Sequence, residues 1–444
     1  MTTNDQDFLK AFYRQLDPAI PADPASSMYV KLYEVADLVP TDPVDELKTA
    51  IDWSVVQSAQ LFSGFRGTGK STELRRLEAR LAADPLNVVV RCDMQDYLNL
   101  STPVDVSDFL LAIAGAFGDE LAKNPRMAGV PLLKEGYWTR FAAWVTRTQV
   151  ELSEVGMSTA SLGVPAELKL NLKQDPTFRQ KLQKRLEGHI GPLTRETHRF
   201  FEDCYKAVVE QFGPEVRLIF LLDSIEQIRG AATNAEAVAD SVATLFHGHA
   251  DKLRLPYLHV VYTVPPWLKI KAPSAAGLYS GYQQIPCVKV RTRDGVPHQP
   301  GLDALAHIVG QRGDWARLLG DRAALDRISL ASGGYLRDLF RILQATLRLA
   351  RGKALPASEA VRTLAIDEIR NSYLPLSQAD AEWLGRVDAS HDSELPAGDR
   401  LPDLARYFDN LLVMTYRNGG EWFGVHPLVV DAVRAARGSG TTGA

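Results

Sequence analysis

The nine residues from Gly64 to Thr72, GFRGTGKST, constrain what this chain can fold into more than any other stretch of it. They satisfy the phosphate-binding pattern G-x-x-x-x-G-K-[ST] at every specified position. Its glycines let consecutive backbone N–H groups point at phosphate oxygens, and the helix that follows presents the positive end of its dipole. The pattern therefore predicts a nucleoside triphosphate site made by Gly64, Phe65, Arg66, Gly67, Thr68, Gly69, Lys70, Ser71 and Thr72.

Two side chains of this loop are expected to carry the chemistry. Lys70 would reach the β- and γ-phosphates of ATP, and Ser71 would bind Mg²⁺ through its hydroxyl. The flanking sequence supports this, because the short apolar run Gln60–Ser63 before the loop predicts a strand. Behind the loop, leucines recur at the spacing of a helix face, at Leu74, Leu77 and Leu81.

Further apolar runs predict the sheet to which this loop belongs. Runs that are apolar on both faces and separated by helical segments are typical of a buried parallel sheet. We therefore expect an α/β fold with a parallel sheet. Its additional strands are predicted at Asn87–Cys92, Val216–Leu222, Tyr257–Thr263 and Ile285–Val290.

Acids beyond one of these runs are candidates for metal binding and catalysis. Asp223 directly follows the apolar run VRLIFLL, where a carboxylate would help to bind Mg²⁺; a helix cap is the alternative. Glu226 is a candidate general base for the attacking water, and an exposed helix acid is an equal alternative.

Two other residues are candidates to sense the phosphates. Thr263 ends a predicted strand and could contact the γ-phosphate; a turn residue beside Pro265 and Pro266 is the alternative. Arg337 follows a Gly-Gly pair in SGGYLRD at the start of a predicted helix. Its guanidinium could reach the phosphates from a helical lid, with an ordinary salt bridge as the alternative.

Composition shifts along the chain predict its organisation. Helical patterns dominate after Leu302, and two helical stretches near the end precede a hairpin at Asn418–Gly420. Trp138, Phe141 and Trp144 lie in a long, mostly helical insertion. The predicted segments are an extended lead-in (1–43), a P-loop core (44–298) with a helical insertion at about 121–210, a helical lid (299–372), a winged-helix-like module (373–437) and a disordered tail (438–444).

Composition suggests no particular partner. The formal charge of −4 on 444 residues lacks the basic excess that non-specific nucleic-acid binding requires. Cys92, Cys204 and Cys287 lie far apart, so we expect neither a disulfide framework nor a structural zinc site. The acidic, polar N-terminus is unlike a secretory signal, and no apolar run is long enough for a membrane span. We therefore expect a cytoplasmic protein.

Taken in order, GFRGTGKST, LIFLLDSIE, YTVPP and SGGYLRDLFRIL resemble the AAA+ and STAND branch of the P-loop ATPases (ASCE type), particularly bacterial proteins with an ATPase core, a helical lid and a winged helix. The resemblance makes Lys70 the phosphate lysine, Ser71 a magnesium ligand, Asp223 the Walker B acid, Thr263 sensor-1-like and Arg337 sensor-2-like.

The chain departs from that pattern in two places. Ser224 follows Asp223 where these ATPases commonly have Glu, and no arginine finger is present between Leu255 and Val290. Both departures favour slow hydrolysis or an arginine supplied by a partner.

The leading hypothesis is a Mg²⁺-dependent ATPase that works as a nucleotide-dependent switch with a protein partner, by analogy in a bacterial signalling or conflict system. The alternative is a DNA-acting loader or remodeller, and a small-molecule kinase is a third possibility. From Tyr373 to Ala444 there are six arginines and ten acids, which gives 6 − 10 = −4. That charge disfavours phosphate binding by the C-terminal module. Oligomerisation is left open.

Overall fold

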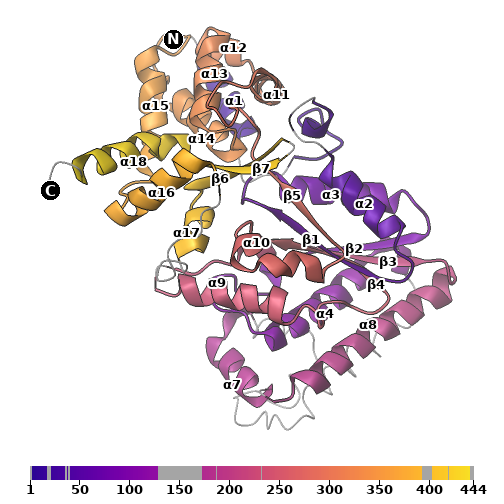
Figure 1. Cartoon of the computed structure of the whole chain (residues 1–444). Helices are drawn as coiled ribbons and strands as arrows, with labels where there is room; N and C mark the ends of the chain where they lie inside the picture. Colours follow the sequence, from indigo (N-terminus) through magenta and orange to yellow (C-terminus); the bar gives the residue numbers. More distant parts are fainter. Residues whose placement is uncertain are drawn as a thin grey trace. The chain divides into compact units, whose positions relative to one another are not determined.

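A computed structural model describes residues 3–17, 22–35, 38, 41–128, 173–186, 188–231, 233–392, 403–418 and 420–440 (Figure 1). The chain forms two compact units. One comprises residues 44–63 and 74–284, and the other comprises residues 1–43, 64–73 and 285–444. The first unit is built around the large sheet. The second contains the phosphate-binding loop, the lid helices and the C-terminal module.

The sheet of the first unit has five strands in the order β2-β3-β4-β1-β5. Their bounds are β1 Ser58–Gly64, β2 Asn87–Asp93, β3 Arg217–Asp223, β4 Leu258–Val264 and β5 Gly281–Ile285. The pairs β2–β3, β3–β4 and β4–β1 are parallel, and every residue of β1 and β4 is buried. Because β4 lies between β1 and β3, the predicted α/β fold with a parallel P-loop sheet of ASCE type is confirmed.

Helices cover this sheet. They are α2 Pro43–Asp52, α3 Lys70–Ala82, α4 Val106–Lys123, α7 Pro176–Leu186, α8 Ile190–Phe212, α9 Ala235–Ala243 and α10 Leu268–Lys271. α4 packs against both β2 and α8 (Figure 1). The predicted leucine face of α3 is correct, since Leu74, Leu77 and Leu81 are fully buried. Trp138, Phe141 and Trp144 lie outside the described residues.

The strand predicted at Ile285–Val290 is wrong in position. β5 ends at Ile285, and the following backbone bonds elsewhere. The Cys287 N–H donates to the Thr415 carbonyl at 3.0 Å, and the Val288 N–H donates to the Gly334 carbonyl at 3.1 Å. The apolar run therefore leaves the sheet because its hydrogen bonds go to the lid and the C-terminal module of its own unit.

The second unit has a helical lid. Its helices are α11 Gln299–Gly310, α12 Trp315–Leu319, α13 Arg322–Ala331, α14 Leu336–Leu349 and α15 Glu359–Asn371. α14 is strongly amphipathic: Leu339 and Leu343 on its inner face are fully buried. Its apolar face forms the centre of one core with residues of α11, α13 and α15.

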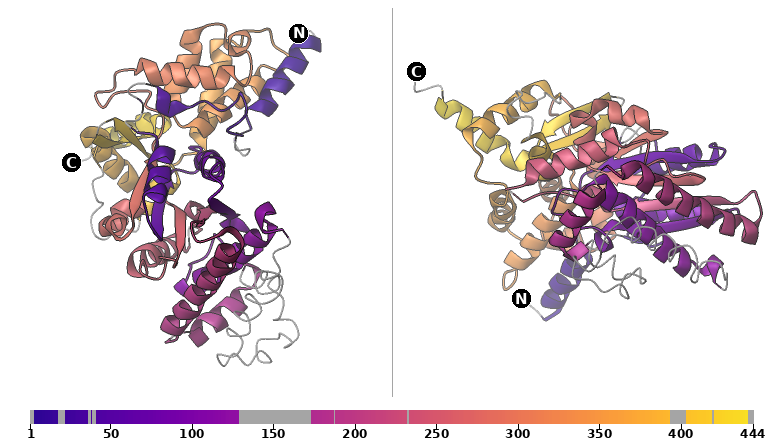
Figure 2. Two further views of the ribbon diagram at one scale, coloured as in Figure 1. Left: turned by 90° about the vertical axis from the view of Figure 1, so that its right-hand side faces the viewer. Right: turned by 90° about the horizontal axis from the view of Figure 1, so that it is seen from below.

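The lead-in contains a helix that the extended interpretation missed. α1 (Thr3–Gln15) packs beside α14, and Figure 2 shows this N-terminal helix next to the lid helices. Leu9, Phe12 and Leu16 are buried in the lid core. Phe12 lies so close to Gly313 that any side chain there would collide with its ring. The proline content obscured this short apolar periodicity.

The C-terminal module contains the predicted pair of helices followed by a hairpin. Its elements are α16 Gln378–Ser390, α17 Asp403–Asp409, β6 Val413–Asn418, β7 Gly420–Val425 and α18 Pro427–Gly440. The strands β6 and β7 are antiparallel, and Tyr416 stacks on Trp422 with ring centroids 4.4 Å apart. Asp380 on α16 accepts hydrogen bonds from Arg406 (2.6 Å) and Tyr407 (2.8 Å), which fixes α17 against α16. Residues 441–444 of the predicted tail lie outside the described residues.

All three cysteines are free and buried. Among the residues described, none of the helices combines the length and the apolar character needed to cross a membrane.

Candidate nucleotide site

The phosphate-binding loop is a tight turn between β1 and α3. Gly67 and Gly69 have φ angles of +85° and +97°, a region that favours glycine. The Thr68 hydroxyl donates to the Phe65 carbonyl at 2.8 Å, and the Glu73 N–H donates to the Gly69 carbonyl at 3.0 Å. The local sequence thus fixes a turn that passes directly into the first turn of a helix, the geometry that an anion site needs.

Lys70 lies within this loop. Its ammonium donates to the carbonyls of Gly64 (2.7 Å) and Phe65 (2.6 Å), and the residue is only 3% exposed. These two bonds hold the ammonium against the backbone of the loop. Ser71, the predicted magnesium ligand, is the second residue of α3 and is partly exposed.

The start of α14 contacts the loop directly. Tyr335 donates a hydrogen bond from its hydroxyl to the Arg66 carbonyl at 2.5 Å. A Cβ atom added to Gly67 would lie 2.7 Å from Arg337 Nε and 2.9 Å from Tyr335 Oη. Burial raises the pKa of Tyr335, so its hydroxyl stays protonated and continues to donate. The loop and the lid are therefore in van der Waals contact at Gly67.

Arg337 is a candidate anion-binding residue at this contact. Its Nε atom is buried and has no hydrogen-bond partner among the described residues. The ordinary salt bridge that was the alternative is not observed in the part of the chain that the structure describes. A buried cationic donor without a partner is costly. A phosphate oxygen at Gly67 would satisfy it.

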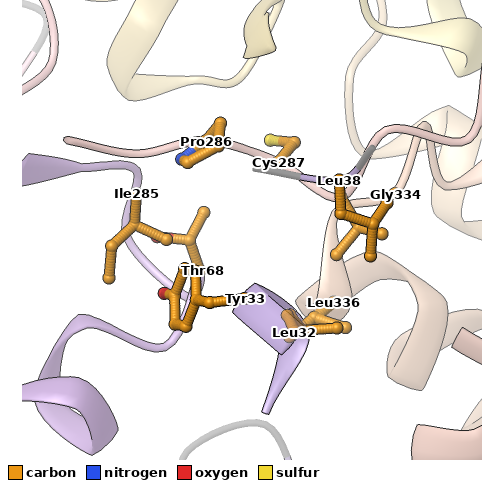
Figure 3. A pocket seen from close by; sticks show the side chains of 10 residues that line it. Leu32, Tyr33, Leu38, Thr68, Ile285, Pro286, Cys287, Gly334 and Leu336 are labelled. Atoms are coloured by element: carbon orange, nitrogen blue, oxygen red, sulfur yellow. The ribbon is translucent and has the colours of Figure 1, made fainter. Parts of the chain in front are cut away.

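An apolar pocket lies on the other side of the loop (Figure 3). Thr68 borders it, and the rest of its lining comes from the lead-in, the segment after β5 and the start of α14. The lining residues are Leu32, Tyr33, Leu38, Thr68, Ile285, Pro286, Cys287, Val288, Gly334 and Leu336. Of residues 29–32 in the lead-in, only Leu32 lines this pocket. Tyr29 instead donates to Glu73 at 3.0 Å.

The sheet unit supplies the other predicted residues at one edge. Asp223 ends β3 and is 4% exposed, and its Oδ1 accepts the Ser224 N–H at 2.8 Å. Thr263, near the end of β4, accepts the Ile225 N–H at 3.0 Å, which ties the two strand ends together. Phe62 of β1 is in register with Thr263. The ends of β1, β3 and β4 therefore point the same way, with β4 between the other two.

Glu226 lies in a short 3-10 helix, η7 (Ile225–Gln227), directly after Asp223 and Ser224. The residue is only 8% exposed, so the alternative of an exposed helix acid is wrong. Ser224 has a φ of +70°, and this left-handed residue turns the chain from the strand into η7. Glu226 is thus a buried carboxylate directly after β3, and its role as a general base stays a prediction.

The sequence analysis did not single out three residues that are in contact or in register with a predicted site residue. Tyr335 stands between the Gly-Gly pair and Arg337, so it could have been found by treating SGGYLRD as one motif. Asp93 ends β2 in register with Asp223, and like Asp223 it directly follows an apolar run. Phe408 of α17 stacks on Phe65 with centroids 5.9 Å apart, a contact between distant segments that had no local signal.

No family model matches the sequence, and no curated protein matches it. Among solved structures, the chain is similar to the Aeropyrum pernix ORC2 protein in its ADP form, with a TM-score of 0.42 and 12% identity over 96% of this chain and 98% of that one. It is also similar to Cdc6p from Pyrobaculum aerophilum (TM-score 0.36, 14% identity, 95% and 100% covered). A third is the Aeropyrum pernix ORC1 protein in complex with DNA (TM-score 0.36, 14% identity, 95% and 97% covered). Because the sequence identities and TM-scores are low, the fold assignment rests on the strand order and the phosphate-binding loop of this chain.

Removing the Tyr335 hydroxyl tests the contact between loop and lid. Tyr335→Phe should accelerate hydrogen exchange of the amides of residues 64–69 by roughly 2- to 10-fold, because a hydrogen bond of this kind contributes about 0.5–1.5 kcal/mol net. Tyr97→Phe, which removes a hydroxyl in the sheet unit, is the control and should leave these amides unchanged. Equal exchange in wild type and Tyr335→Phe would mean that the bond does not hold the loop.

Proposed function

We propose that this protein is an ATP-binding, Mg²⁺-dependent ATPase that works as a nucleotide-dependent switch. The observation that carries the proposal is the unpartnered Arg337 Nε against Gly67. It supports a cationic lid group that contacts the γ-phosphate, as predicted for a sensor-2-like arginine. Such a contact exists only before hydrolysis, so the lid would respond to the state of the nucleotide.

The proposal assigns a part of the nucleotide to each feature. The amides of residues 64–72 and the Lys70 ammonium would hold the phosphates. Ser71 and Asp223 would hold Mg²⁺, which neutralises phosphate charge when bound. Glu226 would take the proton of the attacking water. Thr263 would contact the γ-phosphate as a sensor-1-like residue.

The loop and the start of α14 both contact the C-terminal module, which belongs to the same unit. Phe65, next to Arg66 in the loop, stacks on Phe408 of the C-terminal module. Asp338, next to Arg337, binds Tyr373 at 2.5 Å and lies 3.3 Å from His426 at the start of α18. A displacement of the start of α14 would therefore be felt by that module. A signalling role with a bacterial effector rests only on the sequence resemblance.

Replacing the loop lysine tests nucleotide binding. Lys70→Ala should weaken binding of a fluorescent ATP analogue by roughly 10- to 100-fold, because a charge-assisted hydrogen bond contributes about 1.5–3 kcal/mol. Lys353→Ala, which removes an exposed lysine of the other face of the lid, is the matched control. If Lys70→Ala binds as tightly as wild type, the assignment of the phosphate site fails.

Replacing the buried acid tests hydrolysis separately from binding. Glu226→Gln should lower kcat for ATP hydrolysis by roughly 10²- to 10⁴-fold while leaving the Kd for ATP unchanged, since a general base acts in the transition state. The control is Glu236→Gln at an exposed position of α9. Turnover by Glu226→Gln at the wild-type rate would require another base.

A DNA-acting ATPase is the second candidate. It is favoured by the order of elements in the C-terminal module, two helices, a hairpin and a third helix, which is the order of winged-helix modules. One of the structures reported above is of an ORC1 protein in complex with DNA, and the named structures are of origin-recognition and Cdc6 proteins and not of signalling proteins. The net charge of the module, −4, is the observation against it.

This candidate predicts duplex binding that ATP strengthens and salt weakens. If the module neutralises several phosphates, affinity for a 30-base-pair duplex should fall by roughly 10²-fold or more between 50 and 200 mM salt. Arg417→Glu on the hairpin should remove the binding. Absence of binding at 50 mM salt with ATP present would exclude a DNA-acting role and leave the protein-coupled switch.

A further inference from the structure

A groove lies between α1 and α14, away from the residues assigned to the nucleotide. Its apolar lining residues, here called the floor, are the buried Leu9 and Leu347 and the exposed Tyr13. Its lining also contains Lys10, Arg14 and Arg351, here called the rim. Most of the lining surface is apolar even though basic side chains surround it. A ligand of this groove would therefore need both apolar groups and acidic groups.

The groove is a preformed part of the fold. Phe12 holds α1 in the lid core, where it is 2% exposed. Gln344 of α14 donates to the Tyr13 carbonyl at 3.2 Å, which fixes the last turn of α1 against α14. Tyr13 keeps 43% of its surface exposed. Less than half of Tyr13 is therefore open to solvent.

The positive charge on the rim is not balanced. Lys10, Arg14 and Arg351 are exposed, and none of them forms an ion pair with a carboxylate in the described part of the chain. The fourth basic residue of the groove, Arg348, pairs with Glu368 of α15. Other arginines of the lid are paired as well: Arg317 with Asp5, Arg322 with Asp303 and Arg327 with Glu359.

We propose that this basic groove docks an acidic amphipathic segment of a partner protein. Carboxylates of the segment would lie against the three rim cations, and its apolar side chains would pack on the exposed Tyr13. Charge complementarity identifies the occupant as acidic, and the floor distinguishes it from nucleic acid. A phosphate backbone would satisfy the rim but would leave the apolar floor uncovered.

The groove lies at the end of α14, the helix whose start contacts the phosphate-binding loop. Leu347 and Arg348 lie in the last turn of α14, and the same helix begins next to Arg337. Its fourteen residues make a rigid rod of about 20 Å. The docked segment would therefore bind the far end of the helix whose start contacts the phosphate-binding loop. Docking itself does not depend on the proposed nucleotide function.

The test uses the full-length protein and a phage-displayed library of random 16-residue peptides. Selected peptides should be enriched in Asp and Glu next to Leu, Ile or Phe at helical spacing. Affinity of a fluorescein-labelled selected peptide is then measured by anisotropy. The triple variant Lys10→Glu, Arg14→Glu and Arg351→Glu should lose affinity by about tenfold or more, because each change sets like charges against each other.

The control has the same change in net charge elsewhere. It is Lys184→Glu, Arg195→Glu and Arg199→Glu, three exposed basic residues on α7 and α8. Affinity of this control for the peptide should change by less than about twofold. A second variant, Tyr13→Ala, removes part of the floor without changing the charge and should also weaken binding, which separates docking from misfolding of the triple variant.

Three results would overturn the proposal. One is a selection without acidic and apolar enrichment. Another is a selected peptide that binds the groove variants and wild type equally, or that loses affinity equally in the control. The third is a labelled 20-base-pair duplex that binds the groove more tightly than any selected peptide, which would make it a nucleic-acid surface. None of these readouts requires ATP, so failure here is distinct from failure of Lys70→Ala to weaken nucleotide binding.

Discussion

The contact at Gly67 fixes how the phosphate-binding loop meets the start of α14. The loop can approach the start of α14 this closely only because residue 67 has no side chain and a φ of +85°. Tyr335 then reaches the Arg66 carbonyl, and Arg337 lies against the turn. A larger residue at 67 would separate the loop from the lid even if nucleotide still bound. The proposed phosphate binding by the loop and its contact with the lid thus involve the same glycine.

A second glycine sets the position of the lid. A Cβ on Gly334 would lie 1.8 Å from the Val288 carbonyl oxygen, and the Gly334 carbonyl accepts the Val288 N–H at 3.1 Å. The segment after β5 therefore runs directly against the Gly-Gly turn. Close backbone approach on this side and at Gly67 on the other leaves the start of α14 little freedom. This explains why Gly333 and Gly334, both with positive φ, precede Tyr335.

The sequence predicted local features well and long-range contacts poorly, for a physical reason. The loop pattern, the leucine face of α3 and the strand ending at Asp223 each depend on residues close together in the chain, and the structure has all three. Arg337 was assigned to the phosphates by motif order, and the structure brings it to Gly67. Residues 286–290 were misassigned because their hydrogen bonds go to Gly334 and Thr415, far along the chain. Periodicity carries no information about such partners, and the stacking of Phe65 on Phe408 was invisible for the same reason.

Electrostatics links the start of α14 to the C-terminal module. Burial by itself would raise the pKa of Asp338, but His426, the Tyr373 hydroxyl and Arg341 act in the opposite direction and hold the pKa of that carboxyl below its usual value. Asp338 therefore stays ionised in the first turn of α14, where a negative charge also interacts favourably with the helix dipole. Because His426 is fully buried and directly precedes α18, a movement of the module away from the lid would take His426 from this carboxylate. A change at Arg337, one residue away, would thus move the lid and the module together, which is what a nucleotide-dependent switch requires.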